Sequence, residues 1–238
     1  MCIVITGGTR GLGFEITKLL AASGYQVAVV ARRRSEVFDA WAKQTHNPPS
    51  FHPFDFSTDG DYTVLYNQIV KMHGTIDTLI NNAAVGNDGI LATQHMTDIS
   101  ACITTNLIAP IKFTKICLRS MIKEKKGLVI NISSIIASTG FSGLSVYAAS
   151  KAGLLGFTKS LAREVGKLNI KVVSVSPGYM DTEMTHGIDN ENYKKILRRS
   201  PLGRLITTTE VAKFVNTVIT DPDKFHGQDI ILDCGSTV

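Results

Sequence analysis

The 238-residue sequence lacks the residue spacings that mark several classes of protein. Its four cysteines (Cys2, Cys102, Cys117 and Cys234) lie far apart and form no Cys-x-x-Cys pair, which argues against a disulfide framework and a zinc site. The six histidines show no His-x-x-x-His spacing. We therefore expect free thiols and no bound metal.

Long apolar runs are also missing. No segment approaches the roughly 18 uninterrupted apolar residues of a membrane-spanning helix, and the amino-terminal stretch MCIVITGG carries no charged leader. We expect a cytoplasmic protein with no membrane association. The formal charge is +5, but the short basic clusters ARRR and KEKK contain no interleaved aromatic residues, so nucleic-acid binding is not expected.

Short apolar runs rich in β-branched residues alternate with segments in which apolar residues have helical spacing. Runs that are apolar at successive positions are typical of parallel strands covered by helices on both sides. Strands are expected at 2–6, 26–31, 50–56, 78–83, 128–133, 171–176 and 229–233, and helices at 12–20, 64–72, 97–122, 145–166, 190–198 and 209–219. Within 50–56, Pro53 predicts an edge strand or a position near the start of a strand.

This alternation predicts an α/β, single-domain, Rossmann-like doubly wound fold, with about seven parallel strands flanked by helices on both faces. The sequence shows no linker or repeat, and 44% hydrophobic residues suffice for one packed core, so residues 1–238 are expected to form one domain. The most irregular segment, 179–192, is expected to be a mobile loop and a short helix after the sixth strand.

A glycine-rich turn follows the first expected strand directly. Gly7, Gly11 and Gly13 allow a tight turn, close approach of a ligand to the backbone and close helix packing. A pyrophosphate can then lie against the helix amino terminus. The spacing Gly-x-x-x-Gly-x-Gly differs from the commoner Gly-x-Gly-x-x-Gly, but its place between a strand and a helix predicts a nucleotide site.

The end of the second expected strand indicates which nucleotide is bound. A carboxylate there would bind a ribose 2′-hydroxyl, whereas an arginine can pair with a 2′-phosphate. The strand ends VVARRR, with Arg32 nineteen residues past Gly13 and with Arg10 inside the glycine turn. We therefore predict NADPH (or NADP⁺) as the cofactor; the alternative is that both arginines are solvated surface residues.

Tyr147 and Lys151 form a Tyr-x-x-x-Lys pair on one face of an expected helix. A free phenol has a pKa of about 10, and a cation one turn away favours the phenolate. The pair alone is a weak signal, but other short motifs accompany it along the chain. They are TGGTRGLG at 6–13, DFS at 55–57, NNAA at 81–84, TTNL at 104–107, NISS at 131–134, YAASK at 147–151, SPGYMDTEM at 176–184 and GQDIILDCG at 227–235.

In this order and spacing, the motifs resemble those of the short-chain dehydrogenases/reductases, and the 3-oxoacyl-acyl carrier protein reductases most of all. The resemblance implies that Tyr147 protonates a carbonyl oxygen while NADPH delivers hydride, and that Lys151 also holds the nicotinamide ribose. It implies that Ser134 polarises the carbonyl and that Asn106 holds a water in a proton relay. We choose Ser134 over Ser133 because it lies further beyond the carboxyl end of its strand.

The resemblance also implies a set of cofactor contacts: Asp55 with the adenine, Asn82 and Ala83 on the adenosine ribose side, and Pro177, Gly178 and Thr182 at the nicotinamide end. The full expected cofactor set is Gly7, Thr9, Arg10, Gly11, Leu12, Gly13, Arg32, Asp55, Phe56, Asn82, Ala83, Ala84, Tyr147, Lys151, Pro177, Gly178 and Thr182. Two motifs depart from the family pattern: NNAA replaces NNAG, and Cys234 stands where glycine is common.

The resemblance favours a ketone carried as an acyl thioester, with the product a secondary alcohol. Acyl carrier protein is acidic, and six cations are candidates for its docking surface: Lys123, Lys125, Lys126, Lys159, Arg163 and Lys167. A plain solvated face is the alternative for these residues. Two other functions stay open, namely reduction of another small-molecule ketone and a non-catalytic NADPH-binding regulator. The family implies a homotetramer (or homodimer) through the helices at 97–122 and 145–166.

Overall fold

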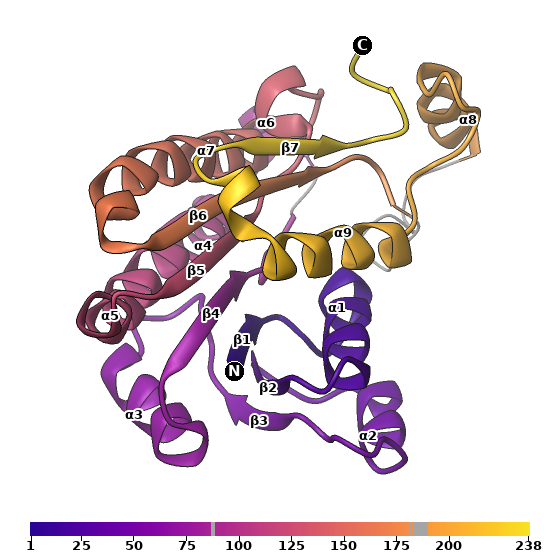
Figure 1. The fold of residues 1–238 in the computed structure, drawn as a ribbon. Helices are drawn as coiled ribbons and strands as arrows, with labels where there is room; N and C mark the ends of the chain where they lie inside the picture. Colours follow the sequence, from indigo (N-terminus) through magenta and orange to yellow (C-terminus); the bar gives the residue numbers. More distant parts are fainter. Residues whose placement is uncertain (87–88, 181, 183–189) are drawn as a thin grey trace.

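The computed structural model describes residues 1–238 except 87–88, 181 and 183–189. Seven strands form one parallel sheet in the order β3-β2-β1-β4-β5-β6-β7 (Figure 1). The strands are β1 (Cys2–Thr6), β2 (Gln26–Ala31), β3 (Ser50–Pro53), β4 (Ile76–Asn81), β5 (Gly127–Ile132), β6 (Ile170–Pro177) and β7 (Asp229–Leu232). The predicted seven-stranded, doubly wound α/β fold is confirmed.

The helices lie on both sides of this sheet. They are α1 (Gly11–Ala22), α2 (Glu36–Ala42), α3 (Tyr62–His73), α4 (Met96–Ile103), α5 (Ala109–Glu124), α6 (Ile136–Thr139), α7 (Ser145–Val165), α8 (Asn190–Arg199) and α9 (Thr208–Thr220). A π-helical turn (Thr104–Ile108) joins α4 to α5, and short 3-10 helices occupy Leu91–Thr93, Gly166–Leu168 and Pro222–Phe225. The expected helix at 97–122 is therefore two α-helices around a π turn.

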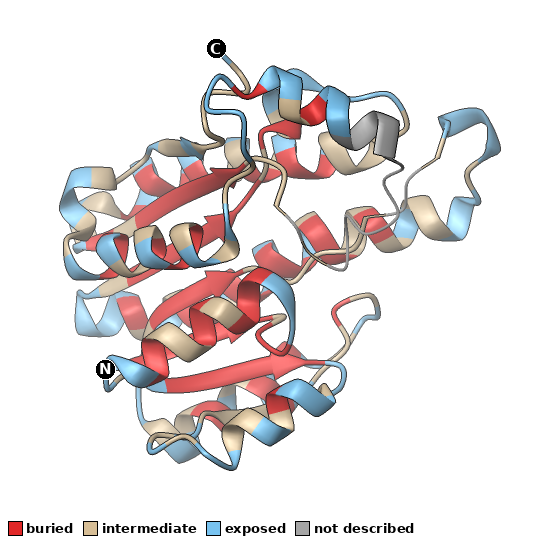
Figure 2. Cartoon of the chain, turned by 90° about the vertical axis from the view of Figure 1, so that its right-hand side faces the viewer, coloured by how far each residue is buried: buried red, intermediate tan, exposed pale blue. Residues whose placement is uncertain are grey.

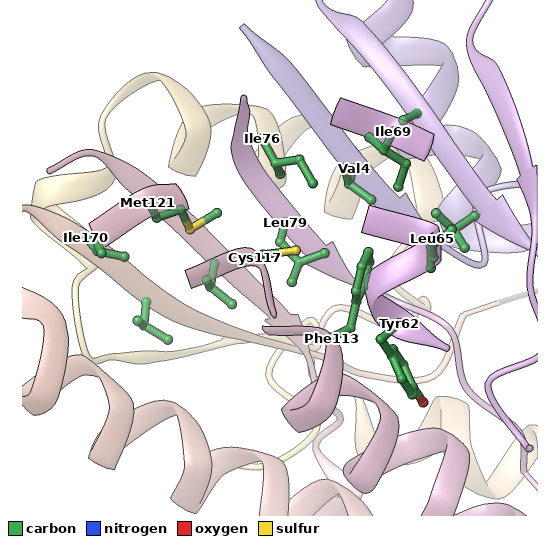
Figure 3. Packing of buried hydrophobic residues seen from close by; sticks show 14 of the residues in the cluster. Val4, Tyr62, Leu65, Ile69, Ile76, Leu79, Phe113, Cys117, Met121 and Ile170 are labelled. Carbon is green, nitrogen blue, oxygen red and sulfur yellow. The ribbon is translucent and has the colours of Figure 1, made fainter. Parts of the chain in front are cut away.

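Alternate residues of β1, β2, β5 and β6 belong to separate apolar clusters on the two faces of the sheet. In β1, Cys2 and Val4 pack with α3, α5 and α7, while Ile3 and Ile5 pack with α1 and α9. Figure 3 shows the first cluster, in which Phe113 lies among side chains from α3 and the strands. Burial follows this division, since the central strands β1, β2, β4, β5 and β6 and the inward helix faces are buried (Figure 2). This two-faced burial explains why the strands read as continuous apolar runs.

Pro53 lies at the end of an edge strand. β3 pairs only with β2, so an edge position is confirmed, and Pro53 is the last residue of β3. The strand stops there instead of at residue 56, and β4 also ends two residues before the expected boundary at 83. As a result Asp55, Asn82 and Ala83 lie in turns beyond strand ends, where a ligand can reach them.

The helical run Met96–Glu124 is long and apolar enough to cross a membrane by length and composition alone. Its side chains Phe113, Cys117 and Met121 are buried in the first apolar cluster, and core helices of globular proteins pass the same test. The prediction of no membrane association is not tested by this helix. Of the segment 179–192, α8 begins at Asn190, and residues 181 and 183–189, where a mobile loop is expected, lie outside the described residues.

Candidate active site

Most of the expected site residues lie at one edge of the sheet. Parallel strands place their carboxyl ends at one edge of the sheet. Strands β1 and β4 are neighbours there, but α1, which follows β1, and α5, which follows β4, cover opposite faces of the sheet. Gly7 follows β1, Asn82 follows β4, Ser134 follows β5 and Gly178 follows β6. This is the topological switch point, the position where doubly wound folds bind their ligands.

The glycine turn after β1 is packed against the turn after β4. A Cβ atom at Gly13 would lie 2.2 Å from the carbonyl oxygen of Gly7 and 2.4 Å from Nδ2 of Asn82. Asn82 Nδ2 donates to the carbonyl oxygens of Thr6 (3.0 Å) and Gly7 (3.2 Å), while Thr6 Oγ1 accepts from the backbone N–H groups of Asn82 and Ala83. Asn82 therefore fixes the shape of the glycine turn, a role that the sequence did not indicate.

The amino terminus of α1 fits an anionic ligand. Arg10, its N-cap residue, makes no side-chain capping hydrogen bond, and the first turn contains no acidic residue. The first backbone N–H groups of a helix have no intrahelical acceptor, so they can bind a phosphate. A Cβ atom at Gly11, whose φ is +52°, would meet nothing within 4 Å, and the backbone there is open to a ligand. These observations match the pyrophosphate of a dinucleotide.

The turn after β2 carries the expected selectivity residue. Arg32 is exposed directly beyond Ala31, and Arg34 is occupied by an ion pair with Asp39 at 3.1 Å and by the Phe51 ring at 4.8 Å. Ser35 Oγ donates to the carbonyl oxygen of Thr9 at 2.7 Å, which joins this turn to the glycine turn. This bond holds the turn that carries Arg32 beside the glycine turn.

Asp55 and Phe56 are adjacent in the chain, but the first has a charged side chain near Arg32 and the second is buried in the core. Burial alone would raise the pKa of the Asp55 carboxyl, but hydrogen bonds from Ser57 and the nearby charge of Arg32 lower it. The carboxylate is thus ionised near Arg32 of the turn after β2. The ring of Phe56 is buried in the first apolar cluster, 5.0 Å from the ring of Phe54, so only its backbone is left for the cofactor contact that the resemblance implies.

The expected nicotinamide-end residues follow β6. The carbonyl oxygen of Pro177 accepts from the N–H of Ile135 (3.1 Å), and the N–H of Gly178 donates to the carbonyl oxygen of Leu232 (2.8 Å). A Cβ atom at Gly178 would lie 2.8 Å from Cβ of Asp233, so packing against the end of β7 already requires glycine there. Thr182 and Ala84 are half-buried. No contact of these residues by itself assigns them to a cofactor.

Lys151 is buried beside Tyr147. Its side chain is 2% exposed, its Nζ donates to the carbonyl oxygen of Ile132 at 2.7 Å, and Nζ lies 5.7 Å from the centroid of the Tyr147 ring. Burial lowers the pKa of Lys151 to about 8. Tyr147 is half-buried, one helical turn before Lys151 on α7. The expected pair is thus a buried ammonium and an accessible phenol on one helix face.

The two serines after β5 have different environments. Ser133 is buried, and its Oγ donates to the carbonyl oxygen of Lys151 at 3.1 Å, so it attaches α7 to the strand. Ser134 is half-buried, and its Oγ accepts from the N–H of Ile136 at 3.2 Å. Because that bond uses an oxygen lone pair, the Ser134 hydroxyl proton can still point to a substrate carbonyl.

Asn106 is 1% exposed, and its amide group is fully engaged. Its Nδ2 donates to the carbonyl oxygen of Val85 (2.9 Å), Ser150 Oγ (3.1 Å) and Cys102 Sγ (3.3 Å), and its Oδ1 accepts from the N–H of Val85 (2.9 Å). The amide therefore ties the turn after β4 to α7. A water held by Asn106 would have to bind its backbone carbonyl instead.

Pro110, which follows the π-helical turn, leaves the backbone carbonyl of Asn106 without its usual donor in an α-helix. Pro110 has no N–H, so it cannot donate to the residue four positions earlier, which is Asn106. The N–H of Ala109 instead bonds the carbonyl oxygen of Thr104, five residues back. Such turns recur at functional sites. Pro110 was a readable sign of this break in the expected helix at 97–122.

The geometry also shows positioning residues that the sequence analysis missed. Ser150 is fully buried, and its Oγ accepts from Asn106 and donates to the carbonyl oxygen of Tyr147 at 2.7 Å. Thr6 holds the turn after β4, and Ser35 holds the glycine turn. Ser150 lies within the YAASK motif itself, but its partner forty-four residues away can be seen only in the fold.

Together the fold and the site define a dinucleotide-dependent oxidoreductase, with a phosphate-binding turn and a Tyr–Lys pair at one sheet edge. The profile of the family described as short chain dehydrogenase matches residues 1–193, and the chain belongs to this family. Members of the family bind a nicotinamide cofactor.

Characterised relatives span nearly the whole chain. Carbonyl reductase family member 4 of Xenopus tropicalis is 37% identical over 235 residues, covering 99% of this chain and 97% of its own. The 3-oxoacyl-[acyl-carrier-protein] reductase FabG of Chlamydia muridarum is 36% identical, covering 98% and 95%, respectively. The human 3-oxoacyl-[acyl-carrier-protein] reductase is 34% identical, covering 99% and 97%. The suspected resemblance to these reductases is confirmed.

Proposed function

We propose that this oxidoreductase reduces a ketone to a secondary alcohol with NADPH, and that its substrate is a 3-oxoacyl group on acyl carrier protein. The observation that best supports carbonyl reduction is the buried ammonium of Lys151, which lies 5.7 Å from the centroid of the Tyr147 ring. The names of the Chlamydia muridarum and human relatives support the substrate class.

NADPH, when bound, supplies the hydride. The α1 amino terminus and the glycine turn would bind its pyrophosphate, and the carboxylate of Asp55 would accept from the adenine. Arg32 and Arg10 would pair with the 2′-phosphate, because an acidic residue is absent from the end of β2. Arg32 is the stronger candidate, since neighbouring Arg34 is already paired with Asp39.

The reacting side chains divide the work on the carbonyl oxygen. Ser134 donates a hydrogen bond that polarises it, and Tyr147 gives it a proton. Ile132 occupies one of the three N–H donors of the Lys151 ammonium, which leaves two for the Tyr147 oxygen and a ribose hydroxyl. The positive charge of Lys151 favours the phenolate that remains after proton transfer. The Asn106 carbonyl would hold the water that returns a proton through Lys151.

A second candidate substrate is a small carbonyl compound that no protein carries. The relative named carbonyl reductase family member 4, at 37% identity, favours this reading. The same four side chains would perform the same chemistry on it. A panel of ketones with and without a carrier protein separates the two substrates, and a regulator without catalytic activity would reduce none of them.

Assembly into a homotetramer (or homodimer) is part of this proposal. Three isoleucines of the π turn and α5, Ile108, Ile111 and Ile122, expose more than a third of their surface. They lie on the helical run that the family resemblance assigns to subunit contacts. Sedimentation at several protein concentrations would test this assembly.

The test of the proposed function is NADPH oxidation with acetoacetyl-acyl carrier protein, with Tyr147→Phe as the comparison. The wild-type chain should turn the substrate over, and the variant should lose about a thousandfold in kcat while it still binds NADPH. Equal rates in the two proteins would reject Tyr147 as the proton donor. Turnover of carrier-free ketones alone would reject the carrier-bound substrate and keep the reductase chemistry.

A further inference from the structure

Cys102 is a buried cysteine in polar surroundings. It is 2% exposed and lies on α4, one residue before the helix ends. It belongs to neither of the two apolar clusters, whereas Cys2 and Cys117 are both buried in the first one. A buried free cysteine usually packs as a small apolar side chain. Packing in the apolar core therefore does not account for the position of Cys102.

The thiol of Cys102 contacts the carboxamide of Asn106. Asn106 Nδ2 donates to Cys102 Sγ at 3.3 Å, and Sγ donates to the carbonyl oxygen of Val85 at 3.8 Å. An amide nitrogen carries two protons, but Asn106 Nδ2 lies within bonding distance of three acceptors, namely Sγ, the Val85 carbonyl oxygen and Ser150 Oγ. The sulfur therefore completes the shell around this amide and shares the Val85 carbonyl with it.

The same thiol lies beside the turn of α7 that carries the Tyr–Lys pair. Burial raises the pKa of Cys102, while a hydrogen bond with Ser150 and the nearby charge of Lys151 lower it. Because burial has the largest effect, the thiol stays protonated at neutral pH and keeps both a donor and an acceptor. Ser150 Oγ in turn donates to the carbonyl oxygen of Tyr147 at 2.7 Å. The sulfur thus contacts both ends of the link from Asn106 to α7.

We propose that Cys102 is a positioning residue for the proton relay: its thiol holds Asn106 and Ser150 so that the Asn106 carbonyl and Lys151 Nζ can share one water. This inference rests on the proposed function, because it assumes that a proton returns to Tyr147 through Lys151. A relay step needs donor and acceptor within hydrogen-bond reach, directly or through one water. Cys102 touches neither substrate nor cofactor in this role.

Three substitutions at Cys102 test this role. Cys102→Ser keeps a group that donates and accepts, Cys102→Val fills the space without a bond, and Cys102→Ala removes both the bond and the bulk. The measurements are KM for NADPH and for the ketone, kcat, and the ratio of kcat in H₂O to kcat in D₂O. The ketone is acetoacetyl-acyl carrier protein or, where wild type reduces only carrier-free ketones, the fastest of those.

Cys102→Val and Cys102→Ala should each lower kcat about fivefold, the effect of losing one modest hydrogen bond, and should raise the solvent isotope ratio because proton transfer becomes slower. Both KM values should stay within about twofold of wild type, since Thr6 holds the turn after β4 independently. Cys102→Ser should keep the wild-type kcat and ratio. A loss of folded protein alone would lower the rate and leave the isotope ratio unchanged.

Cys117, buried in the first apolar cluster, is the matched control (Figure 3). Cys117→Val should be tolerated, whereas Cys117→Ser should lower the free energy of unfolding because it brings a hydroxyl into an apolar cluster. Neither should change kcat per folded molecule or the isotope ratio, so the order of Val and Ser reverses between the two cysteines.

Three outcomes would overturn the positioning role: wild-type kcat and isotope ratio in Cys102→Val and Cys102→Ala, an equal loss in Cys102→Ser, or a loss in Cys102→Val alone, which would mean crowding. Failure of the proposed function looks different, because wild type itself would then reduce no ketone.

Discussion

The turn after β1 and the turn after β5 lie at the same edge of the sheet, but they hold their functional groups by different means. The β1 turn is shaped by glycines and by the side chains of Thr6 and Asn82, and the expected cations, Arg10 in this turn and Arg32 after β2, are exposed. Near the β5 turn, the polar side chains of Asn106, Ser150 and Lys151 are buried. Asn106 donates a hydrogen bond to Ser150 on α7, and Lys151 donates one to a backbone carbonyl of β5. We call these regions the cofactor side and the reacting side.

Because of this difference, substitutions on the two sides should affect different properties, namely cofactor binding on one side and catalysis on the other. At Gly13 on the cofactor side a new atom has no space, so substitutions there should alter the shape of the turn and weaken cofactor binding. On the reacting side each buried polar group carries a desolvation cost that its hydrogen bonds offset, so substitutions should remove chemistry and leave the fold. Lys151 is the extreme case, because burial lowers its pKa to about 8.

The largest expected effect is that of Lys151→Met. Activity should fall about a thousandfold, since the cation that favours the Tyr147 phenolate is lost. The free energy of unfolding at pH 7 should nevertheless rise, by on the order of 1 kcal/mol, because a buried charge is removed. Denaturant unfolding and NADPH oxidation measure both quantities. A destabilised variant would show that the bond to Ile132 outweighs desolvation.

The same group predicts a pH dependence of stability. The pKa of Lys151 is about 8 in the folded chain, and an unfolded lysine has a pKa of about 10.4. Between these values the unfolded chain binds more protons, so the free energy of unfolding should increase as pH rises from 8 to 10. Lys151→Met should remove this slope. Identical slopes in the two proteins would mean that Lys151 is not desolvated.

Gly13→Ala should give the next largest effect, on the cofactor side. The added Cβ would lie 2.2 Å from a backbone carbonyl oxygen, so the variant should lose about 1–3 kcal/mol of stability and bind NADPH at least tenfold more weakly. Gly156→Ala on α7 is the control, because its Cβ would meet nothing within 4 Å and alanine favours a helix. Fluorescence titration with NADPH compares the two. Wild-type affinity in Gly13→Ala would show that the turn can adjust.

Arg32→Ala should have a smaller and more selective effect. Loss of a charged hydrogen bond to a 2′-phosphate should weaken NADPH binding about tenfold and leave NADH binding unchanged. Arg34→Ala serves as the comparison, since Arg34 pairs with Asp39 and lies over the Phe51 ring. Equal weakening of both cofactors in Arg32→Ala would assign this arginine to general charge attraction.

The two sides also differ in how far the sequence could predict them. Gly13 and Lys151 lie in short motifs whose spacing predicts their roles. The glycine spacing predicts close packing and ligand approach at the turn, and the Tyr147–Lys151 spacing predicts a shared helix face. The clamp from Asn82 to Gly7 joins positions 75 apart, and Ser150 meets Asn106 across 44. No local pattern carries such pairs, because they depend on strand order. The π turn is intermediate, since Pro110 marks it locally.

The smallest expected effect lies away from both sides of the site, at the amino-terminal edge of the sheet, where Ser50 begins β3 and His73 ends α3. Ser50 Oγ lies 3.0 Å from Nε2 of His52 and 2.7 Å from Nε2 of His73, between β3 and α3. Burial lowers the pKa of both imidazoles, and the nearby charge of His73 lowers the pKa of His52 further. Since the unfolded chain binds more protons below about pH 6.5, the free energy of unfolding should decrease as pH falls from 7 to 5. His73→Gln, which can keep a bond to Ser50 without titrating, should flatten this decrease. If the slope persists unchanged in that variant, His73 does not contribute to it, and the decrease comes from other groups.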